Sequence, residues 1–169
     1  MYNDYSIEWT DLISQLNKLE ESAFRYNQLD KNIMERDLKN ALNQKDELKV
    51  LRIVKMMSEE ILFANSIELV LEDLVQIMVY GNEECIGYAM NAIGHLNIKK
   101  WRNEIIKYIY KYTEKYKKDP FVFRYAWRLL YNLNLKKELL NYIDMYKEQL
   151  RYEITEDDKA DIERLTEFV

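Results

Sequence analysis

The chain has 169 residues, of which 48% are hydrophobic and 33% are charged, and its net charge is −5. This composition excludes an intrinsically disordered chain and fits one globular domain over residues 1–169. Three glycines, one proline and a lack of Asn-Gly and Asp-Gly dipeptides argue against a β-sheet protein, which needs such turns. We therefore expect an all-α fold.

Other features indicate a cytoplasmic protein. The single cysteine, Cys85, cannot form an internal disulfide. The N-terminal residues lack the basic and apolar regions of a signal peptide. The longest apolar stretch, 67–80, is interrupted by acidic residues and is shorter than the roughly 20 residues that a membrane-spanning helix needs. We expect a soluble protein with no membrane contact.

The first predicted pair of helices covers residues 6–43. Ser6 can cap a helix that runs to about Gln28, and Asp30 can cap the second helix. We expect these two helices to form a hairpin. Apolar residues spaced by three and four form a stripe along the first helix. They are Trp9, Leu12, Ile13, Leu16, Leu19 and Ala23.

The second predicted pair covers residues 46–80. Residues 46–63 are apolar on nearly every side, so we expect this helix to be buried on several sides. Ser66 can cap the next helix, from Ile67 to Tyr80. The dipeptide Gly81-Asn82 then ends that helix and begins the following one.

The third predicted pair covers residues 83–117. Its first helix contains Gly87 and Gly94, which share one face because they are seven residues apart. Glycine inside a helix costs about 1 kcal/mol relative to alanine. We expect the close approach of a neighbouring helix to offset this cost, and a ligand resting on the backbone is the less favoured alternative.

The fourth predicted pair covers residues 120–151. It begins at Asp119-Pro120, an aspartate cap followed by a proline in the first turn. We expect its first helix to bury Phe121, Tyr125 and Leu129, together with Trp127 and Leu130. A short acidic helix over 155–168 would cap the C-terminal end of the fold.

A short phrase is repeated within the last two pairs. Leu96-Asn97-Ile98-Lys99-Lys100 recurs as Leu133-Asn134-Leu135-Lys136-Lys137, and Tyr88-Ala89 and Tyr125-Ala126 precede the two copies at the same offset. Two-helix units of this length are typical of stacked helical repeats.

Together with the Asp119-Pro120 start, these residues resemble HEAT and armadillo repeats over residues 46–151. The usual mid-repeat proline and following Asp/Arg pair are not kept outside that start. The resemblance implies a right-handed α-solenoid of about four antiparallel helix pairs and a C-terminal capping helix. A four-helix bundle is a weaker alternative, because it does not explain the repeat.

Groups that could support catalysis or bind a metal are scarce. The single histidine, His95, has no carboxylate three or four residues away, and no second histidine or cysteine can complete a zinc site. Its position at a helix end suits a hydrogen bond to a turn carbonyl. We expect no enzymatic activity and no catalytic, cofactor or metal site.

Charge is distributed unevenly, with a net −8 over residues 1–98, +8 over 99–151 and −5 over 152–169. Nine of the 14 tyrosines lie between Tyr108 and Tyr152, among lysines and arginines. Because aromatic side chains among cations can stack on bases, a HEAT-like nucleic-acid-binding protein or DNA glycosylase is an alternative. The acidic ends disfavour nucleic acid, since they would repel a polyanion.

The composition is also similar to that of small, acidic, Lys/Asn/Ile-rich helical-repeat proteins of bacteria. Several of these are immunity proteins of polymorphic-toxin or contact-dependent inhibition systems. The resemblance implies a non-enzymatic protein that binds a cognate toxin domain and blocks it. A regulatory adaptor or scaffold is a further alternative, and the sequence leaves the oligomeric state open.

The second helix of each pair, which lines the concave face of a solenoid, supplies the candidate partner-binding residues. They are Glu68, Glu72, Asp73, Gln76, Arg102, Lys107, Tyr108, Lys111, Asn141 and Asp144. Acidic residues from one layer beside basic residues from the next suit a folded protein partner better than a uniform polymer.

Overall fold

The structure is a computed structural model that describes residues 6–62, 64–153, 155–156 and 159–160. Within these residues the chain forms helices and no strand, which confirms the all-α prediction. The helices are α1 (Ile7–Tyr26), α2 (Lys31–Leu42), α3 (Glu47–Ser58), α4 (Ala64–Leu69), α5 (Leu71–Tyr80), α6 (Glu83–Gly94), α7 (Ile98–Tyr116), α8 (Phe121–Asn132), α9 (Lys136–Met145) and α10 (Lys147–Glu153).

Polar side chains fix the starts of the early helices. The Ser6 hydroxyl accepts a hydrogen bond from the Trp9 backbone N–H at 3.2 Å, and Asp30 and Asn82 cap α2 and α6 in the same way. These caps confirm the predicted starts. Ser66 behaves differently from the prediction, because it lies inside α4 and its hydroxyl donates to Asn27 Oδ1 at 2.7 Å.

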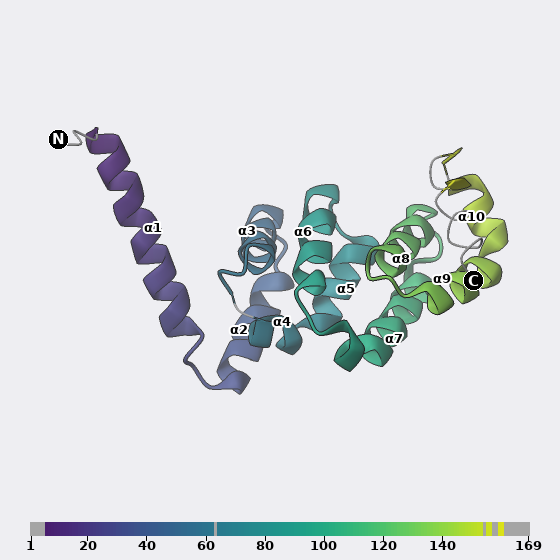
Figure 1. The fold of residues 1–169 in the computed structure, drawn as a ribbon, viewed down its shortest axis with the longest axis horizontal. Helices are drawn as coiled ribbons and strands as arrows, with labels where there is room; N and C mark the ends of the chain where they lie inside the picture. Colours follow the sequence, from purple (N-terminus) through teal and green to yellow (C-terminus); the bar gives the residue numbers. More distant parts are fainter. Residues whose placement is uncertain (1–5, 63, 154, 157–158, 161–169) are drawn as a thin grey trace.

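The helices follow one another in two rows (Figure 1). In one row, α3 packs against α6, and Asn132 of α8 donates to the sulfur of Met90 in α6. In the other row, α2 packs against α4, and α5 packs against α7. A hydrogen bond between Thr113 of α7 and Tyr142 of α9 joins these two helices. The helices α1 and α10 lie at opposite ends of the molecule.

The helix α5 lies at the centre of the hydrophobic core. It contacts α6, α7 and α8, and five of its ten residues are buried: Leu71, Leu74, Val75, Met78 and Val79. The sequence pattern predicted that residues 46–63 would be buried on several sides. The helix α3 packs against α6 and α2, but only Val50, Val54 and Met57 of it are buried and Leu48 is 66% exposed, so it is less enclosed than predicted.

Gly81 ends α5 as expected, whereas the two glycines inside α6 differ from the prediction. A Cβ atom on Gly81 would lie 2.3 Å from the Ile77 carbonyl oxygen, so this helix end requires glycine. A Cβ atom on Gly87 or Gly94 would meet nothing within 4 Å. The predicted close approach of a neighbouring helix is therefore absent, and Gly94 instead borders a surface cavity of about 450 Å³.

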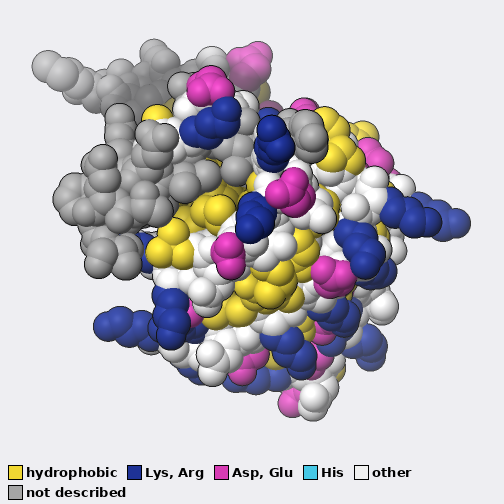
Figure 2. Space-filling model, turned by 90° about the vertical axis from the view of Figure 1, so that its right-hand side faces the viewer, with side chains coloured by type: hydrophobic (Ala, Val, Ile, Leu, Met, Phe, Trp, Pro, Cys, Tyr) yellow, Lys and Arg dark blue, Asp and Glu magenta, His cyan; other side chains and the backbone are white. Residues whose placement is uncertain are grey.

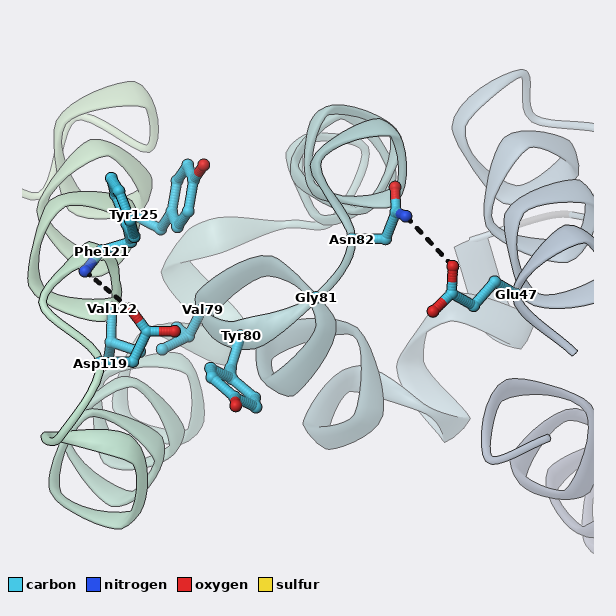
Figure 3. A pocket seen from close by; sticks show the side chains of 9 residues that line it. All are labelled: Glu47, Val79, Tyr80, Gly81, Asn82, Asp119, Phe121, Val122 and Tyr125. Carbon is cyan, nitrogen blue, oxygen red and sulfur yellow. Dashed lines mark hydrogen bonds between the residues drawn. The ribbon is translucent and has the colours of Figure 1, made fainter. Parts of the chain in front are cut away.

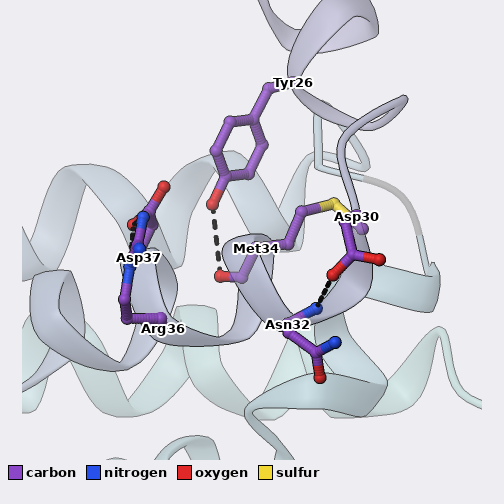
Figure 4. A network of polar contacts seen from close by, with 6 residues as sticks. All are labelled: Tyr26, Asp30, Asn32, Met34, Arg36 and Asp37. Carbon is purple, nitrogen blue, oxygen red and sulfur yellow. Dashed lines mark hydrogen bonds and ion pairs between the residues drawn. The ribbon is translucent and has the colours of Figure 1, made fainter.

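The first helix is held at its C-terminal end. The Tyr26 hydroxyl donates to the Met34 carbonyl of α2 at 3.2 Å (Figure 4). The buried Asn27 side chain accepts from the Ser66 hydroxyl at 2.7 Å. Along the rest of α1 the apolar stripe stays exposed, and Ala23 is its one buried member. The two helices are consecutive, as predicted, but α1 points away from the body of the molecule instead of lying along α2 (Figure 1).

The C-terminal part agrees with the predicted helices in outline. The expected helix over 136–151 is divided at Tyr146 into α9 and α10. The capping helix expected over 155–168 lies largely outside the described residues; within them, Lys159 N–H donates to the Thr155 carbonyl at 3.0 Å. In the part of the chain that the structure describes, no helix has the length and apolarity to cross a membrane.

Candidate partner-binding surface

Two glutamates join the α4–α5 segment to α7. Glu68 Oε1 accepts from Lys100 Nζ at 3.0 Å and from Trp101 Nε1 at 3.1 Å. Burial tends to raise the pKa of the Glu68 carboxyl, but these hydrogen bonds outweigh it and hold the pKa below its usual value. Glu68, an acidic candidate residue from the second predicted helix pair, is therefore bonded to the basic helix α7 of the third pair.

Glu72 forms the second connection. Its carboxylate pairs with Lys111 and accepts from the Tyr112 hydroxyl at 3.0 Å. The hydrogen bond from Lys111 holds the pKa of Glu72 below its usual value. Burial, together with the hydrogen bond to Glu72, raises the pKa of Tyr112. Both candidate residues, Glu72 and Lys111, thus also connect α5 to α7.

Two more candidates, Arg102 and Asp73, are accounted for by similar contacts. Arg102 pairs with Glu138 of α9, and the Asp73 carboxylate accepts from Asn43 Nδ2 at 2.9 Å. Gln76 is half-buried on α5. The polar residues predicted to face a partner are therefore largely engaged in holding adjacent helices together.

The exposed edge of α7 carries lysines that lie over aromatic rings. Lys107 Nζ is 5.7 Å from the Tyr108 ring centroid, and Lys111 Nζ is 5.2 Å from that of Tyr112. Lys115 Nζ is 4.8 Å from that of Tyr116. Such contacts hold a cation in place at an exposed site. We call Lys107, Tyr108, Lys111, Lys115 and Tyr116 the α7 surface.

A cavity of about 400 Å³ lies beside the C-terminal end of α7 (Figure 3). Tyr80 and Phe121, which line it, are 48% and 53% exposed as whole residues, and Glu47 and Asp119 also line it. The full lining is Glu47, Val79, Tyr80, Gly81, Asn82, Asp119, Phe121, Val122 and Tyr125, which we call the Tyr80 pocket.

Two aromatic rings connect this pocket to the α7 surface. The rings of Tyr80 and Tyr116 are stacked, with centroids 4.0 Å apart and an interplanar angle of 11°. Because Lys115 lies over the Tyr116 ring, a basic edge and a pocket lined by two carboxylates adjoin one another. The α7 surface and the Tyr80 pocket together could bind a partner that presents acidic groups to the lysines and a basic group to the carboxylates.

The last two candidates, Asn141 and Asp144, lie on α9. With Tyr110 and the exposed Met145 they line a surface cavity of about 610 Å³. Figure 2 views the end of the molecule that carries α9 and α10, where apolar side chains lie among projecting lysines and arginines. The candidates thus fall into two groups, one on α4, α5 and α7 and the other on α9.

The histidine has the role expected for a helix end. His95 Nε2 lies 2.9 Å from the Ser58 carbonyl oxygen, and Nδ1 lies 2.8 Å from Glu60 Oε1. These contacts tie the C-terminal end of α6 to the turn after α3. Among the residues that the structure describes, no group of three or more His, Cys, Asp and Glu is arranged to hold a metal ion.

Sequence reasoning missed the Tyr80 pocket. It expected Phe121 to be buried, but α8 begins there and Phe121 is exposed, whereas Trp127, Leu129 and Leu130 of the expected set are buried. Tyr125 is half-buried at the pocket. The one signal in the sequence was the helix start predicted at Asp119-Pro120. It places Phe121 in the first turn of the helix, at the helix end and not in its middle. The stacking of Tyr80 on Tyr116 had no signal in the sequence.

The two copies of the repeated phrase meet in space. A cavity of about 570 Å³ is lined by Ile98, Lys99 and Arg102 at the first copy and by residues 133–138 at the second copy.

No family model, curated protein sequence or solved structure matches the chain.

Proposed function

We propose that the chain is a non-enzymatic protein-binding module whose helices stack as a right-handed HEAT-like solenoid. Its role is that of an immunity protein, which binds a cognate bacterial toxin domain and blocks it. The partner would contact the α7 surface and the Tyr80 pocket together. The stack of Tyr80 on Tyr116, which joins these two regions, is the observation that carries the proposal.

The chemistry of the two regions favours a folded protein as the partner. The α7 surface presents lysines, and the adjoining pocket presents the carboxylates of Glu47 and Asp119 beside two exposed rings. A partner with an acidic patch could meet the lysines while a basic side chain entered the pocket. Such opposed patches give orientation and fast association, whereas a uniform polyanion would be repelled by the pocket.

Exposed aromatic residues supply the expected anchors. Tyrosine and tryptophan dominate the binding energy of many protein interfaces, and aromatic residues in general are enriched in them. Phe121 and Tyr80 are rings about half exposed at the rim of a cavity, so a partner could bury them without reorganising the core. The class of partner, a toxin domain, comes from the similarity in composition to bacterial immunity proteins.

The proposal is tested by co-expression with the protein encoded beside this gene. We expect that protein to inhibit growth when produced alone, and we expect this chain to restore growth and to form a complex with it. Phe121→Ala should weaken the complex by at least about tenfold, as expected for an interface anchor.

A matched control separates binding from folding. Arg36→Glu changes an exposed residue of α2, a helix that contributes no residue to the α7 surface or to the Tyr80 pocket, and should leave the complex unchanged. An unaltered complex with Phe121→Ala, or failure of the chain to restore growth, would contradict the proposal.

A second candidate is nucleic-acid binding, favoured by the cavity between the repeated phrases. Lys99, Lys136 and Lys137 line it. This alternative predicts binding of a DNA duplex that falls steeply with salt and is lost in a Lys99→Glu, Lys136→Glu variant. No retardation of DNA at low salt would eliminate it.

A further inference from the structure

Three tyrosine rings form a stacked column at the C-terminal end of α7. The ring centroids of Tyr80 and Tyr116 are 4.0 Å apart, and the interplanar angle is 11°. The rings of Tyr116 and Tyr112 follow at 6.1 Å and 13°. The hydrogen bond from the Tyr112 hydroxyl to Glu72 fastens the inner end of the column to α5. Tyr116 is therefore the middle ring, between the buried Tyr112 and the exposed Tyr80.

The middle ring also holds a cation in place. The Lys115 Nζ atom is 4.8 Å from the Tyr116 ring centroid and 5.5 Å from that of Tyr112. The nearby Lys111 and Lys117 form ion pairs, whereas no carboxylate among the described residues pairs with Lys115. The exposed Lys115 ammonium is thus positioned by rings, and its charge is available to a partner.

Tyr116 also fixes the distance between this cation and the exposed tyrosine. The two centroid distances place Lys115 Nζ within about 9 Å of the centre of the Tyr80 ring. Side chains one turn apart on a helix have Cβ atoms about 5–6 Å apart. Two neighbouring side chains of a partner can therefore contact Lys115 and Tyr80 at the same time.

The two contacts call for different chemistry. Lys115 suits an acidic side chain. Tyr116 covers one face of the Tyr80 ring, yet Tyr80 is still 48% exposed, so the rest of the ring is open. The Asp119 carboxylate lines the same pocket (Figure 3), and within the described residues only its Oδ1 atom has a hydrogen bond, from the Phe121 N–H at 3.1 Å. An arginine suits both groups, because its planar guanidinium stacks on aromatic rings and pairs with carboxylates.

We propose that Lys115, Tyr116 and Tyr80 form one recognition unit, which binds an acidic side chain and an arginine that neighbour each other on the partner. Lys115 pairs with the acidic side chain, and the arginine stacks on Tyr80. Tyr116 contacts neither group and is the positioning residue that holds the other two. The inference rests on the proposed function, because it specifies which groups the bound protein presents.

Nuclear magnetic resonance of the free chain tests the positioning role without any partner. Protons held over an aromatic ring resonate upfield, so the Lys115 Hε signals should lie upfield of those of Lys18, an exposed lysine of α1. Tyr116→Phe should keep this shift. Tyr116→Leu, which retains an apolar side chain but no ring, should reduce it. Signals of Lys115 at the position of Lys18, or a shift that Tyr116→Leu leaves unchanged, would overturn the inference.

The affinity of the chain for the protein encoded beside its gene tests the recognition unit. Tyr116→Leu should weaken the complex about two- to tenfold, the fold-change expected for the loss of one aromatic pair, and Tyr116→Phe should keep the wild-type affinity. In a Tyr80→Ala background, Tyr116→Leu should have a smaller effect, because the ring that it positions is gone. Equal effects in the two backgrounds would contradict the positioning role.

A second ring stack provides the matched control. Tyr131 of α8 is half-buried like Tyr116, and it stacks on Trp127 with centroids 5.6 Å apart. It belongs neither to the α7 surface nor to the Tyr80 pocket. Tyr131→Leu therefore removes a comparable ring and should leave the affinity unchanged. The same loss of affinity in both leucine variants would indicate a general effect on the fold and would count against the recognition unit.

Substitutions in the partner test the arginine. Among single arginine-to-lysine variants of the protein encoded beside this gene, one should weaken the complex, and its effect should be smaller with Tyr80→Ala or Asp119→Asn. Asparagine at position 119 removes the charge but still caps α8. A tight wild-type complex in which no arginine behaves in this way would overturn the inference and leave the proposed function standing. If the wild type forms no complex, the proposed function fails, and the recognition unit fails with it.

Discussion

The Tyr112 hydroxyl donates a hydrogen bond to Glu72 Oε1 at 3.0 Å, and these residues are 40 positions apart in the chain. The same carboxylate pairs with Lys111. The Tyr112 side chain is buried, so this contact ties the inner side of α7 to α5 while Lys111 remains at the surface. Residues that sequence analysis assigned to partner binding therefore also hold the fold together.

Replacing Glu72 should cost stability. Glu72→Ala leaves the Tyr112 hydroxyl without its acceptor and should lower the free energy of unfolding by about 1–3 kcal/mol. Urea denaturation measures the change. Glu35→Ala is the matched control, because Glu35 pairs with Lys39 at an exposed i,i+4 position and its loss should cost at most about 0.5 kcal/mol. Equal losses in the two variants would contradict this role of Glu72.

Stability should fall in acid below about pH 4.5, the ordinary pKa of these carboxyl groups. The folded state lowers the pKa of Glu68 and Glu72, so it binds their protons less tightly than the unfolded chain does. Their contribution is full above the unfolded pKa and is lost as the pH falls through the folded pKa. A Glu68→Gln, Glu72→Gln variant should be less stable at pH 7 and lose less on acidification. An unchanged acid dependence in thermal unfolding would count against this assignment.

A buried polar pair between α7 and α9 offers a second stability test. Thr113 Oγ1 and the Tyr142 hydroxyl share a hydrogen bond at 3.0 Å, and both residues are fully buried. Thr113→Val should cost about 1–3 kcal/mol, because it leaves the Tyr142 hydroxyl without a partner. In a double-mutant cycle with Tyr142→Phe, the double variant should lose less than the sum of the single losses. Additive losses would show that the two hydroxyls do not interact.

Replacing Gly87 and Gly81 by alanine should change the stability of the chain in opposite directions. Gly87→Ala introduces a methyl group into open space within α6 and should stabilise the chain by about 0.5–1 kcal/mol. Gly81→Ala places a Cβ atom against the Ile77 carbonyl and should destabilise it by about 1–3 kcal/mol. Thermal unfolding compares the two variants directly. A destabilised Gly87→Ala variant would indicate that this face of α6 is covered.

Local signals in the sequence predicted the helices well. Ser6, Asp30 and Asn82 each bond a backbone N–H at a helix start, and such caps act within four residues, so a single sequence reveals them. The turn at Gly81 and the bond from His95 to a turn carbonyl follow from similarly local rules.

Long-range arrangement was not predictable in the same way. The pattern of residues 46–63 shows that α3 is apolar, but it cannot show that α5 occupies the centre. The stripe of α1 shows an apolar face without showing whether the same chain covers it. Glu68 and Glu72 were predicted on one helix but lie on α4 and α5, and the pairing of Glu72 with Lys111 depends on how α5 and α7 pack.

Binding to the neighbouring gene's product tests the central claim most directly. The Lys107→Glu, Lys115→Glu variant changes two lysines of the α7 surface that lie over aromatic rings and leaves the pair of Glu72 and Lys111 in place. Isothermal titration calorimetry of the wild-type chain, this variant and Arg36→Glu would give three affinities. We predict a tight complex for the wild type and the Arg36 control, and at least a tenfold loss for the α7 variant. Equal affinity of all three, or no binding by any, would contradict the account.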